Sequence, residues 1–144
     1  MTINDAGLAL IKRAEGLRLE AYQDGGSVWT IGYGSTLGVH KGMVITPGEA
    51  ERRLLEDLSR HDITPYLDGC ATTPNQFAAM TSLAFNIGLD KFHGSTVLKR
   101  HKQGNYDRAA SAFALWCYDN GKRVQGLINR REAERQLYLR KDGA

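Results

Sequence analysis

The sequence predicts an α+β fold in which helices dominate. Apolar residues recur at helical spacing in several stretches that together cover most of the chain. Residues that favour strands are concentrated between residues 17 and 33, where they flank a turn signal. No internal repeat is present, and we expect the strands to be confined to the first third of the chain. A small antiparallel sheet with helices segregated from it is the α+β arrangement.

The first predicted helix ends at Glu15. Its apolar residues recur at helical spacing and are Ile3, Gly7, Leu10 and Ala14. Gly16 then supplies the usual stop signal. Two short strand-like runs follow on either side of Asp24-Gly25-Gly26, which is a good hairpin turn.

Two further helices carry capping signals. Thr46-Pro47-Gly48-Glu49 is a capping box with proline at the first helical position, so a helix is predicted from Pro47 to about His61. Thr73-Pro74-Asn75-Gln76 opens another helix in the same way, and Gly88 ends it. Arginines on the first of these helices are expected to be solvated charges, and they are Arg52, Arg53 and Arg60.

Shorter helices are expected in the last third of the chain, at Ser95 to about Lys102, Tyr106 to Trp116 and Asn129 to about Leu139. The stretch Ile63–Ala71, which contains Pro65, is expected to break the helical pattern.

The composition is that of a globular protein of one domain, with 144 residues, 42% hydrophobic and 24% charged. No secretory signal is evident, and no stretch approaches the ~20 apolar residues that a membrane span needs. We therefore expect a protein that stays in the cytoplasm unless something releases it, with no stable membrane insertion. The net charge of +3 does not separate nucleic acid from an anionic cell wall as a partner.

The cysteine and histidine pattern predicts no metal site. Cys70 and Cys117 are too few for a disulfide framework, and we expect two buried, reduced thiols. The four histidines are scattered, and neither an HExxH nor a CxxC motif is present.

Two carboxylic acids and a hydroxyl form the candidate catalytic group. Glu15, Asp24 and Thr30 fall within sixteen residues, on a helix end, a turn and a strand. The carbonyl end of a helix disfavours a negative charge on Glu15, whereas the open turn favours an ionised Asp24. A protonated acid facing an ionised carboxylate is the arrangement that hydrolyses a glycosidic bond. Taken singly, each residue has an ordinary structural explanation, so the prediction depends on their joint spacing.

This spacing, followed by Ile31-Gly32-Tyr33-Gly34, resembles the catalytic signature of the phage-type lysozymes, glycoside hydrolase family 24. The resemblance covers nearly the whole chain, with the motifs in family order. The other matching segments are Gly42–Thr46 with Glu49-Ala50, Ala84–Gly88, Trp116, Gly126–Ile128 and Arg130–Glu134.

The resemblance implies a lysozyme-like fold for residues 1–144. In that fold a sheet-bearing lobe, about residues 15–46, is joined by a helix, about 47–61, to a helical lobe, about 62–144 with the N-terminal helix. It also implies that Glu15 is the proton-donating acid and that Asp24 and Thr30 hold the attacking water. Weaker matches make Thr36, Phe85 and Ser95 candidate substrate contacts.

The function that the resemblance implies is an endolysin that cleaves the β-1,4 bond between N-acetylmuramic acid and N-acetylglucosamine in peptidoglycan with inversion. The expected partner is peptidoglycan and not nucleic acid, and the expected state is a monomer without a cofactor. The protein would wait in the host cytoplasm and reach the periplasm through a holin-type hole.

Several alternatives stay open at this point. Phe85 is also readable as a core aromatic and Ser95 as a helix N-cap. Lys122 and Arg123 lie in a predicted loop, either as solvated charges or near the catalytic acid. A lytic transglycosylase would act on the same bond. A non-catalytic module that binds glycan or nucleic acid would use a basic footprint made of Arg130, Arg131, Arg135 and Arg140.

Overall fold

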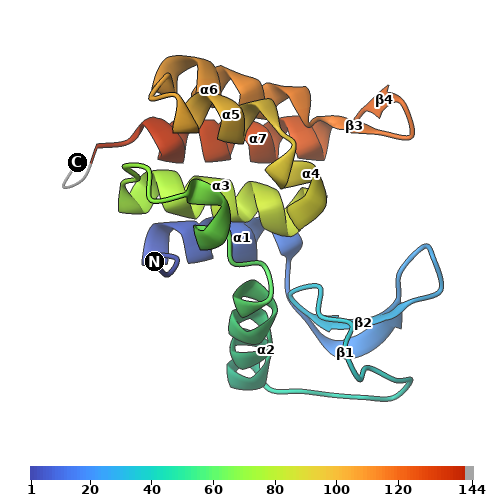
Figure 1. Ribbon diagram of the computed structural model, residues 1–144. Helices are drawn as coiled ribbons and strands as arrows, with labels where there is room; N and C mark the ends of the chain where they lie inside the picture. The colour runs from blue at the N-terminus through green and yellow to red at the C-terminus, as the bar shows by residue number, and fades with distance from the viewer. Residues whose placement is uncertain (142–144) are drawn as a thin grey trace. The chain divides into compact units, whose positions relative to one another are not determined.

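The computed structural model describes residues 1–141 of the chain (Figure 1). Its elements in chain order are α1 (Asp5–Glu15), β1 (Arg18–Gln23), β2 (Trp29–Gly32), α2 (Pro47–Ser59), η1 (Thr64–Leu67), α3 (Pro74–Ile87), α4 (Leu89–His93), α5 (Thr96–Lys102), α6 (Tyr106–Ala112), η2 (Phe113–Leu115), β3 (Tyr118–Asp119), β4 (Lys122–Arg123) and α7 (Gln125–Leu139). The predicted class, α+β with helices dominating, is confirmed.

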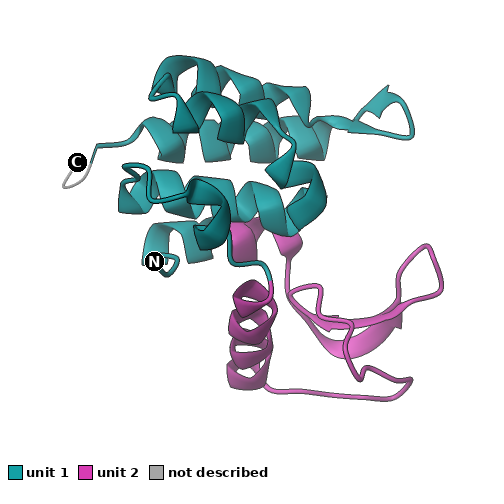
Figure 2. Ribbon diagram, in the orientation of Figure 1, with its two compact units in different colours: residues 1–10, 61–144 teal, residues 11–60 magenta. Residues whose placement is uncertain are grey.

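The chain divides into two compact units, coloured separately in Figure 2. Residues 1–10 and those from 61 onward form unit 1, which is helical apart from one short hairpin. Residues 11–60 form unit 2, which holds the β1–β2 hairpin and helix α2. The division falls inside α1, so this helix contributes its first part to unit 1 and its last residues, including Glu15, to unit 2.

Unit 1 is built around α3, which packs along α7. The predicted start of α3 is confirmed as a complete capping box, because the Thr73 side chain accepts from the backbone N–H of Gln76 and the Gln76 side chain accepts in return. Met80 and Leu83 on α3 are fully buried. The N-terminal part of α1 lies against α3 at Gly7, where an added Cβ would stand 2.5 Å from the Cβ of Ala78. A glycine inside this helix therefore permits a close approach of two helices.

Unit 2 has a small core under an exposed hairpin. The strands β1 and β2 are antiparallel, with Tyr22 opposite Thr30 and Gln23 opposite Trp29. No residue of β1 is buried, so the strand is held mainly by its backbone hydrogen bonds. Its outer edge bonds to the segment before α2, through Ala21 N–H to the Met43 carbonyl and Ile45 N–H to the Leu19 carbonyl, both at 2.9 Å. The buried apolar cluster of this unit is Ile31, Ile45 and Ala50.

Three local predictions need correction. Strands are not confined to the first third, because β3 and β4 pair around Asn120-Gly121, both with positive φ. Lys122 and Arg123 therefore lie in a hairpin strand and not in a loop. An Asn-Gly pair is a strong hairpin signal, but two-residue strands have too little pattern around it. The predicted capping box at Thr46 is only half formed, because the Glu49 carboxylate accepts from the Thr46 hydroxyl and not from its backbone.

The helices α4 and α7 also differ from the prediction. The five residues of α4, between Gly88 and Gly94, are too few to show a helical period. The last helix begins at Gln125 and not at Asn129. The sequence does not indicate this start, because Gly126 disfavours a helix and no side chain caps its first turn. Packing of α7 on α3 stabilises the first turn in the folded protein.

Candidate active site

Glu15 is the last residue of α1. Gly16 follows it at φ 72°, and its N–H donates to the Lys12 carbonyl at 3.0 Å. A glycine in the left-handed conformation ends the helix here because other residues adopt that conformation at a cost. The predicted helix end is confirmed, and the half-buried Glu15 is the last helical residue of α1.

A tight turn after β2 lies against the Glu15 carboxyl group. Ile31 and Ser35 exchange two backbone hydrogen bonds of 2.9 Å each, which closes the turn. Gly34 within it has φ +87°, and an added Cβ would stand 3.2 Å from Glu15 Oε1. Gly34 thus meets two requirements, since the turn needs a positive φ and the carboxyl group occupies the space that a side chain would take.

Asp24 and Thr30 are joined through one carbonyl group. The Val28 carbonyl accepts the backbone N–H of Asp24 at 2.9 Å and the hydroxyl of Thr30 at 3.1 Å. Asp24 is exposed, and its Oδ1 accepts the N–H of Gly25 at 2.7 Å. Thr30 is 4% exposed and opposite Tyr22 in the ladder. Because the Thr30 hydroxyl donates its hydrogen to Val28, its oxygen is left as an acceptor.

Lys12 connects α1, α2 and the turn. Its ammonium group forms an ion pair with Glu51 of α2. The same nitrogen stands 5.8 Å from the centroid of the Tyr33 ring, within the range of a cation–π contact. Lys12 lies three residues before Glu15 on α1, so the last turn of α1 is tied to its neighbours within unit 2.

Thr36 is exposed on the loop that follows this turn. Arg53 of α2 holds the loop, because its guanidinium group donates to the Leu37 carbonyl at 3.0 Å and to the Ser35 hydroxyl at 3.4 Å. The interpretation of Arg53 as a solvated charge is therefore wrong. No local signal could have revealed this role, because the partners lie sixteen and eighteen residues away in the sequence.

The other two candidate contacts, Phe85 and Ser95, lie in unit 1, whereas Glu15, Asp24, Thr30 and Thr36 lie in unit 2. Phe85 is half-buried and makes an edge contact with His61, with the ring centroids 5.2 Å apart. Ser95 is 3% exposed, and its hydroxyl accepts the N–H of Leu98 at 3.2 Å. The interpretation of Ser95 as an N-cap is thus confirmed.

A buried ionic cluster on α7 was not predicted. Glu134 is fully buried and accepts from the Ser82 hydroxyl at 2.5 Å, and it pairs with Arg131 at 2.8 Å and with Arg130 at 3.4 Å. Burial raises the pKa of the Glu134 carboxyl group, and the two arginines oppose that effect. Arg131 also donates to the Trp116 carbonyl at 3.3 Å, which links α7 to the chain just before β3.

This cluster weakens the alternative of a basic nucleic-acid module. Arg130 is 8% exposed and Arg131 is 2% exposed, so two of the four arginines of its footprint do not reach a polyanion. Arg135 forms a two-point ion pair with Glu132 on the exposed face of α7. These charges pair along the helix, Arg130 with Glu134 four residues on and Arg135 with Glu132 three residues back.

Cysteine, metal and membrane features were checked over residues 1–141. Cys70 and Cys117 are both free; Cys117 is buried, whereas Cys70 is only half-buried, so the expectation of two buried thiols holds for one of them. In this part of the chain no three metal-ligating side chains cluster, and no helix is both long and apolar enough to span a bilayer.

Comparison with known proteins identifies the family. The family model described as "Phage lysozyme" matches residues 12–134. The endolysin of Acyrthosiphon pisum secondary endosymbiont phage 1 is 45% identical over 96% of this chain and 98% of its own length. A P22 lysozyme mutant has a TM-score of 0.87 at 40% identity, covering 97% of this chain and 99% of the other. The muramidase domain of SpmX from Asticaccaulis excentricus has a TM-score of 0.85 at 36% identity, over 97% and 99%. The chain belongs to the phage lysozyme family and is a glycosidase of the lysozyme type.

Proposed function

We propose that this chain is an endolysin that hydrolyses the β-1,4 bond between N-acetylmuramic acid and N-acetylglucosamine in bacterial peptidoglycan. The observation that carries the proposal is the arrangement within unit 2. There the carboxyl group of Glu15, the last residue of α1, lies close to Gly34. The backbone N–H of Asp24 and the hydroxyl of Thr30 both donate to the Val28 carbonyl group. Relatives described as endolysins and a muramidase domain of similar fold support the choice of substrate.

In this proposal Glu15 is the general acid. It donates its proton to the glycosidic oxygen as the bond to the anomeric carbon breaks, so that the leaving sugar departs as an alcohol. The close contact with Gly34 restricts where the carboxyl group can lie.

Asp24 and Thr30 position the attacking water. Both the Asp24 carboxylate and the Thr30 oxygen act as acceptors, so together they take up the two hydrogens of a water molecule and leave a lone pair for the anomeric carbon. Asp24 receives the proton that the water loses. Attack from the face opposite the leaving group inverts the configuration, and such enzymes separate their carboxyl groups by roughly 6.5–9.5 Å.

The test is Glu15→Gln, assayed on purified peptidoglycan by mass spectrometry of the released fragments. The variant is expected to lose activity and keep its unfolding curve. Glu20→Gln is the matched control, because Glu20 is an exposed acid of the same unit. Retained activity in Glu15→Gln would contradict the proposed acid. If the peptidoglycan fragments released by the unmodified enzyme instead end in an anhydro-sugar, and are therefore one water lighter, the enzyme is a lytic transglycosylase.

Sugar contacts are proposed at Thr36, Phe85 and Ser95. Thr36 and Phe85 have surface left to meet a ligand, whereas Ser95 is the weakest of the three because its buried hydroxyl already caps α5. Thr36→Val and Phe85→Ala are expected to raise KM more than they lower kcat, since these residues would bind ground state and transition state alike. An unchanged KM would remove the residue concerned from the site.

We further propose that the protein works as a monomer and reaches the periplasm from the host cytoplasm through a holin-type hole. The support is its likeness to phage endolysins over nearly their full length. Sedimentation of the purified chain tests the first statement. Lysis of cells that express the chain with and without a holin tests the second, and rapid lysis without one would contradict it.

A further inference from the structure

The turn at residues 31–35, which lies against Glu15, is weakly determined by its own sequence. It contains Gly32 at φ 66° and Gly34 at φ 87°. Glycine has more accessible backbone conformations than any other residue, so a turn with two glycines has little conformational preference of its own. The two hydrogen bonds between Ile31 and Ser35 close the turn, but they do not set how far Gly34 lies from the carboxyl group. Contacts from outside the turn therefore have to fix that distance.

Lys12 supports the turn from the side of α1. Its ammonium nitrogen lies 5.8 Å from the centroid of the Tyr33 ring, and Tyr33 directly precedes Gly34. The ion pair with Glu51 of α2 holds the ammonium group in that place. Lys12 and Glu15 are three residues apart on α1, so they lie on the same side of the helix. Lys12 therefore ties the turn to the helix face that carries the acid.

Arg53 supports the other end of the turn. Its guanidinium group donates to the Ser35 hydroxyl at 3.4 Å and to the Leu37 carbonyl at 3.0 Å. Arg53 lies on α2, and so does Glu51, the ion-pair partner of Lys12. Helix α2 therefore holds the turn at two points, once directly and once through the lysine of α1.

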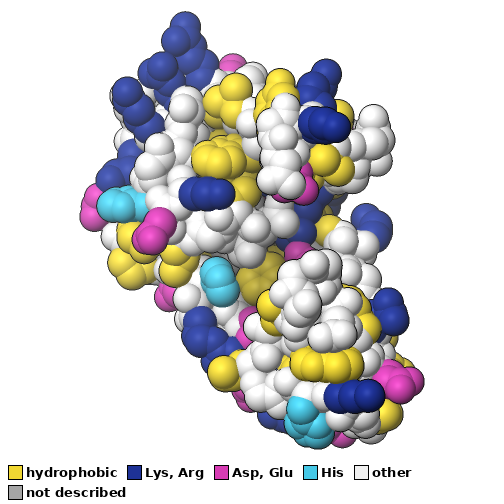
Figure 3. All heavy atoms as spheres, turned by 90° about the vertical axis from the view of Figure 1, so that its right-hand side faces the viewer, with side chains coloured by type: hydrophobic (Ala, Val, Ile, Leu, Met, Phe, Trp, Pro, Cys, Tyr) yellow, Lys and Arg dark blue, Asp and Glu magenta, His cyan; other side chains and the backbone are white. Residues whose placement is uncertain are grey.

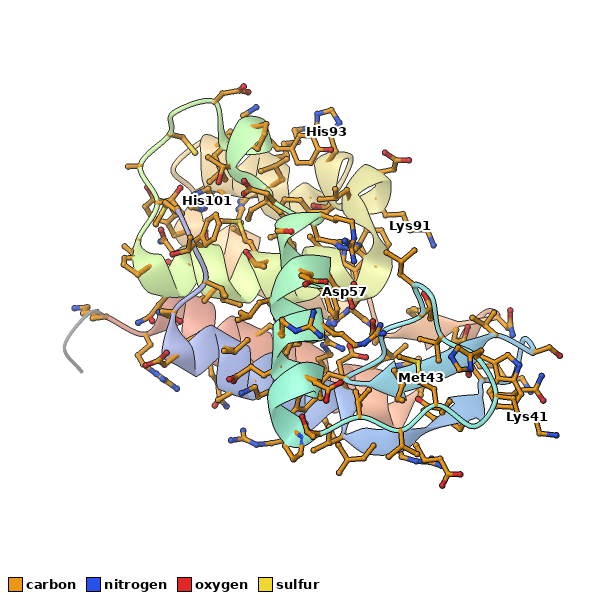
Figure 4. The ribbon with its side chains drawn as sticks, turned by 90° about the horizontal axis from the view of Figure 1, so that it is seen from below. Lys41, Met43, Asp57, Lys91, His93 and His101 are labelled. Atoms are coloured by element: carbon orange, nitrogen blue, oxygen red, sulfur yellow. The ribbon has the colours of Figure 1, made fainter. Side chains whose placement is uncertain are left out.

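The cations of unit 2 do not gather into a patch that would attract a polyanion. On α2, Arg52 pairs with Glu56, and Arg60 pairs with Asp57, which Figure 4 labels on this helix. On the face shown in Figure 3, the Lys and Arg side chains of unit 2, in the lower part of the view, are scattered among uncharged and hydrophobic side chains. A polyanion is held by several cations on one surface. The role of a cation in this unit therefore comes from its own contacts.

Stability does not account for the contacts of Lys12. The side chains of Lys12 and Glu51 are 29% and 47% exposed, and an ion pair this exposed contributes little to the free energy of unfolding. Positioning has a larger effect, because a misplacement of about 1 Å at a reacting group lowers a rate by about 100-fold. The contacts of Lys12 are therefore expected to matter for the acid more than for the fold.

We propose that Lys12 and Arg53 are positioning residues for the general acid, because together they hold the turn at residues 31–35 against the Glu15 carboxyl group. The assignment rests on the proposed function, in which Glu15 donates the proton. Neither positioning residue needs to touch the substrate. When either contact is lost, the turn moves away from the carboxyl group, and the acid samples more orientations before each proton transfer.

Steady-state kinetics of the full chain on solubilised peptidoglycan test the role of Lys12. Lys12→Met is expected to lower kcat about tenfold while KM and the unfolding curve stay unchanged, because only the charge is removed. Lys12→Arg should restore kcat to within about twofold, because a guanidinium group also pairs with a carboxylate and stacks on an aromatic ring. Arg13→Met removes the neighbouring, exposed cation of α1 and should leave kcat unchanged.

Arg53→Met is expected to lower kcat by a similar factor with KM unchanged. Its control is Arg52→Met, which removes the exposed cation next to it on α2.

A double variant tests whether Lys12 acts through the ring of Tyr33. Tyr33→Leu removes that ring, so Lys12→Met combined with Tyr33→Leu should be no slower than the slower of the two single variants. Losses that multiply in the double variant would contradict this path.

The proposal is overturned for Lys12 or for Arg53 if kcat stays unchanged in the methionine variant of that residue. It is also overturned if Arg13→Met and Arg52→Met lose as much activity, or if Lys12→Arg is as slow as Lys12→Met. Failure of the proposed function looks different, because Glu15→Gln would then retain activity. Failure of the positioning role alone leaves Glu15→Gln inactive and the Lys12 and Arg53 variants fully active.

Discussion

The helical unit buries large side chains in a continuous cluster, whereas in the sheet-bearing unit no residue of strand β1 is buried. In unit 1 helices α3, α5, α6 and α7 all contribute to one apolar core, and this core also encloses charged and polar groups such as Glu134 and His101. In unit 2, Ile31, Ile45 and Ala50 form one small cluster, and the other buried apolar side chains are Ile11, Leu54 and Leu58.

The candidate catalytic residues lie in the unit whose backbone can move at the lower free-energy cost. Glu15, Asp24 and Thr30 lie in the unit with less buried apolar surface, on a helix end, a turn and a strand. Segments with few buried contacts and many exposed backbone hydrogen bonds open at a lower free-energy cost than a helical core. We therefore expect unit 1 to set the global stability and unit 2 to set the geometry of the carboxyl groups.

The largest effect on stability is expected at the buried ionic cluster. Glu134→Ala leaves two buried arginines without their shared carboxylate, and we expect a loss of about 3–5 kcal/mol in the free energy of unfolding. Glu132→Ala, two residues away on the exposed face, is the control and should change stability little. Urea denaturation measures both. Equal effects would show that burial of the cluster does not matter.

A smaller loss is expected from the core of unit 2. Ile31→Ala removes a fully buried side chain from a cluster of three, and we expect about 2–3 kcal/mol because a small core can partly collapse onto the gap. Native-state hydrogen exchange should report the loss in β2 and not in α3. A uniform loss across both units would mean that the two units unfold as one.

Substitution of Gly34 is expected to lower both the stability of unit 2 and the activity of the enzyme. Gly34→Ala and Gly38→Ala both place a side chain at positive φ, so each should cost about 1–2 kcal/mol. Only at Gly34 does the new methyl group approach the Glu15 carboxyl, since nothing lies within 4 Å at Gly38. We expect kcat to fall about 10- to 100-fold for Gly34→Ala alone. Equal activity in the two variants would show that this contact does not position Glu15.

The smallest expected effect is a pH dependence of the unfolding free energy that comes from His101 in unit 1. His101 in unit 1 is 1% exposed and lies between Tyr138 and Thr72, at 2.7 and 2.9 Å. Burial lowers the pKa of His101 below its ordinary value of 6.5, so the unfolded chain binds the proton more readily. Its contribution to stability is full above pH 6.5 and is lost as the pH falls below that value.

The slope of this loss is at most about 1.4 kcal/mol per pH unit. Unfolding free energies measured between pH 5 and 7 test it, with His101→Gln as the comparison, because glutamine keeps polar partners but does not titrate in this range. A steeper slope in the variant than in the original chain would contradict the assignment.

Much of the fold was predictable because its signals are local. The capping residues at Thr73, the glycine stop after Glu15 and the turn at Asp24-Gly25-Gly26 act within a few residues, and the structure contains each of them. The same is true of the N-cap at Ser95. The hairpin at Asn120-Gly121 also had a local signal, but its strands are too short to show a period.

The geometry of the candidate site was less accessible to prediction. The roles of Gly34 beside Glu15 and of Arg53 on the Ser35–Leu37 segment depend on contacts across fifteen to twenty residues. The burial of Arg130, Arg131 and Glu134 is also invisible in a sequence where charged residues usually face water. Their pairing could be predicted from helical spacing, whereas their depth could not.

By itself, the sequence determined the fold class, the family and the spacing of Glu15, Asp24 and Thr30, because propensity, capping and motif spacing are properties of neighbouring residues. Only the tertiary structure decided which charges are buried and which glycine lies against the acid. These features arise when segments distant in sequence pack together, and the free energy of burial depends on that packing and not on the order of residues.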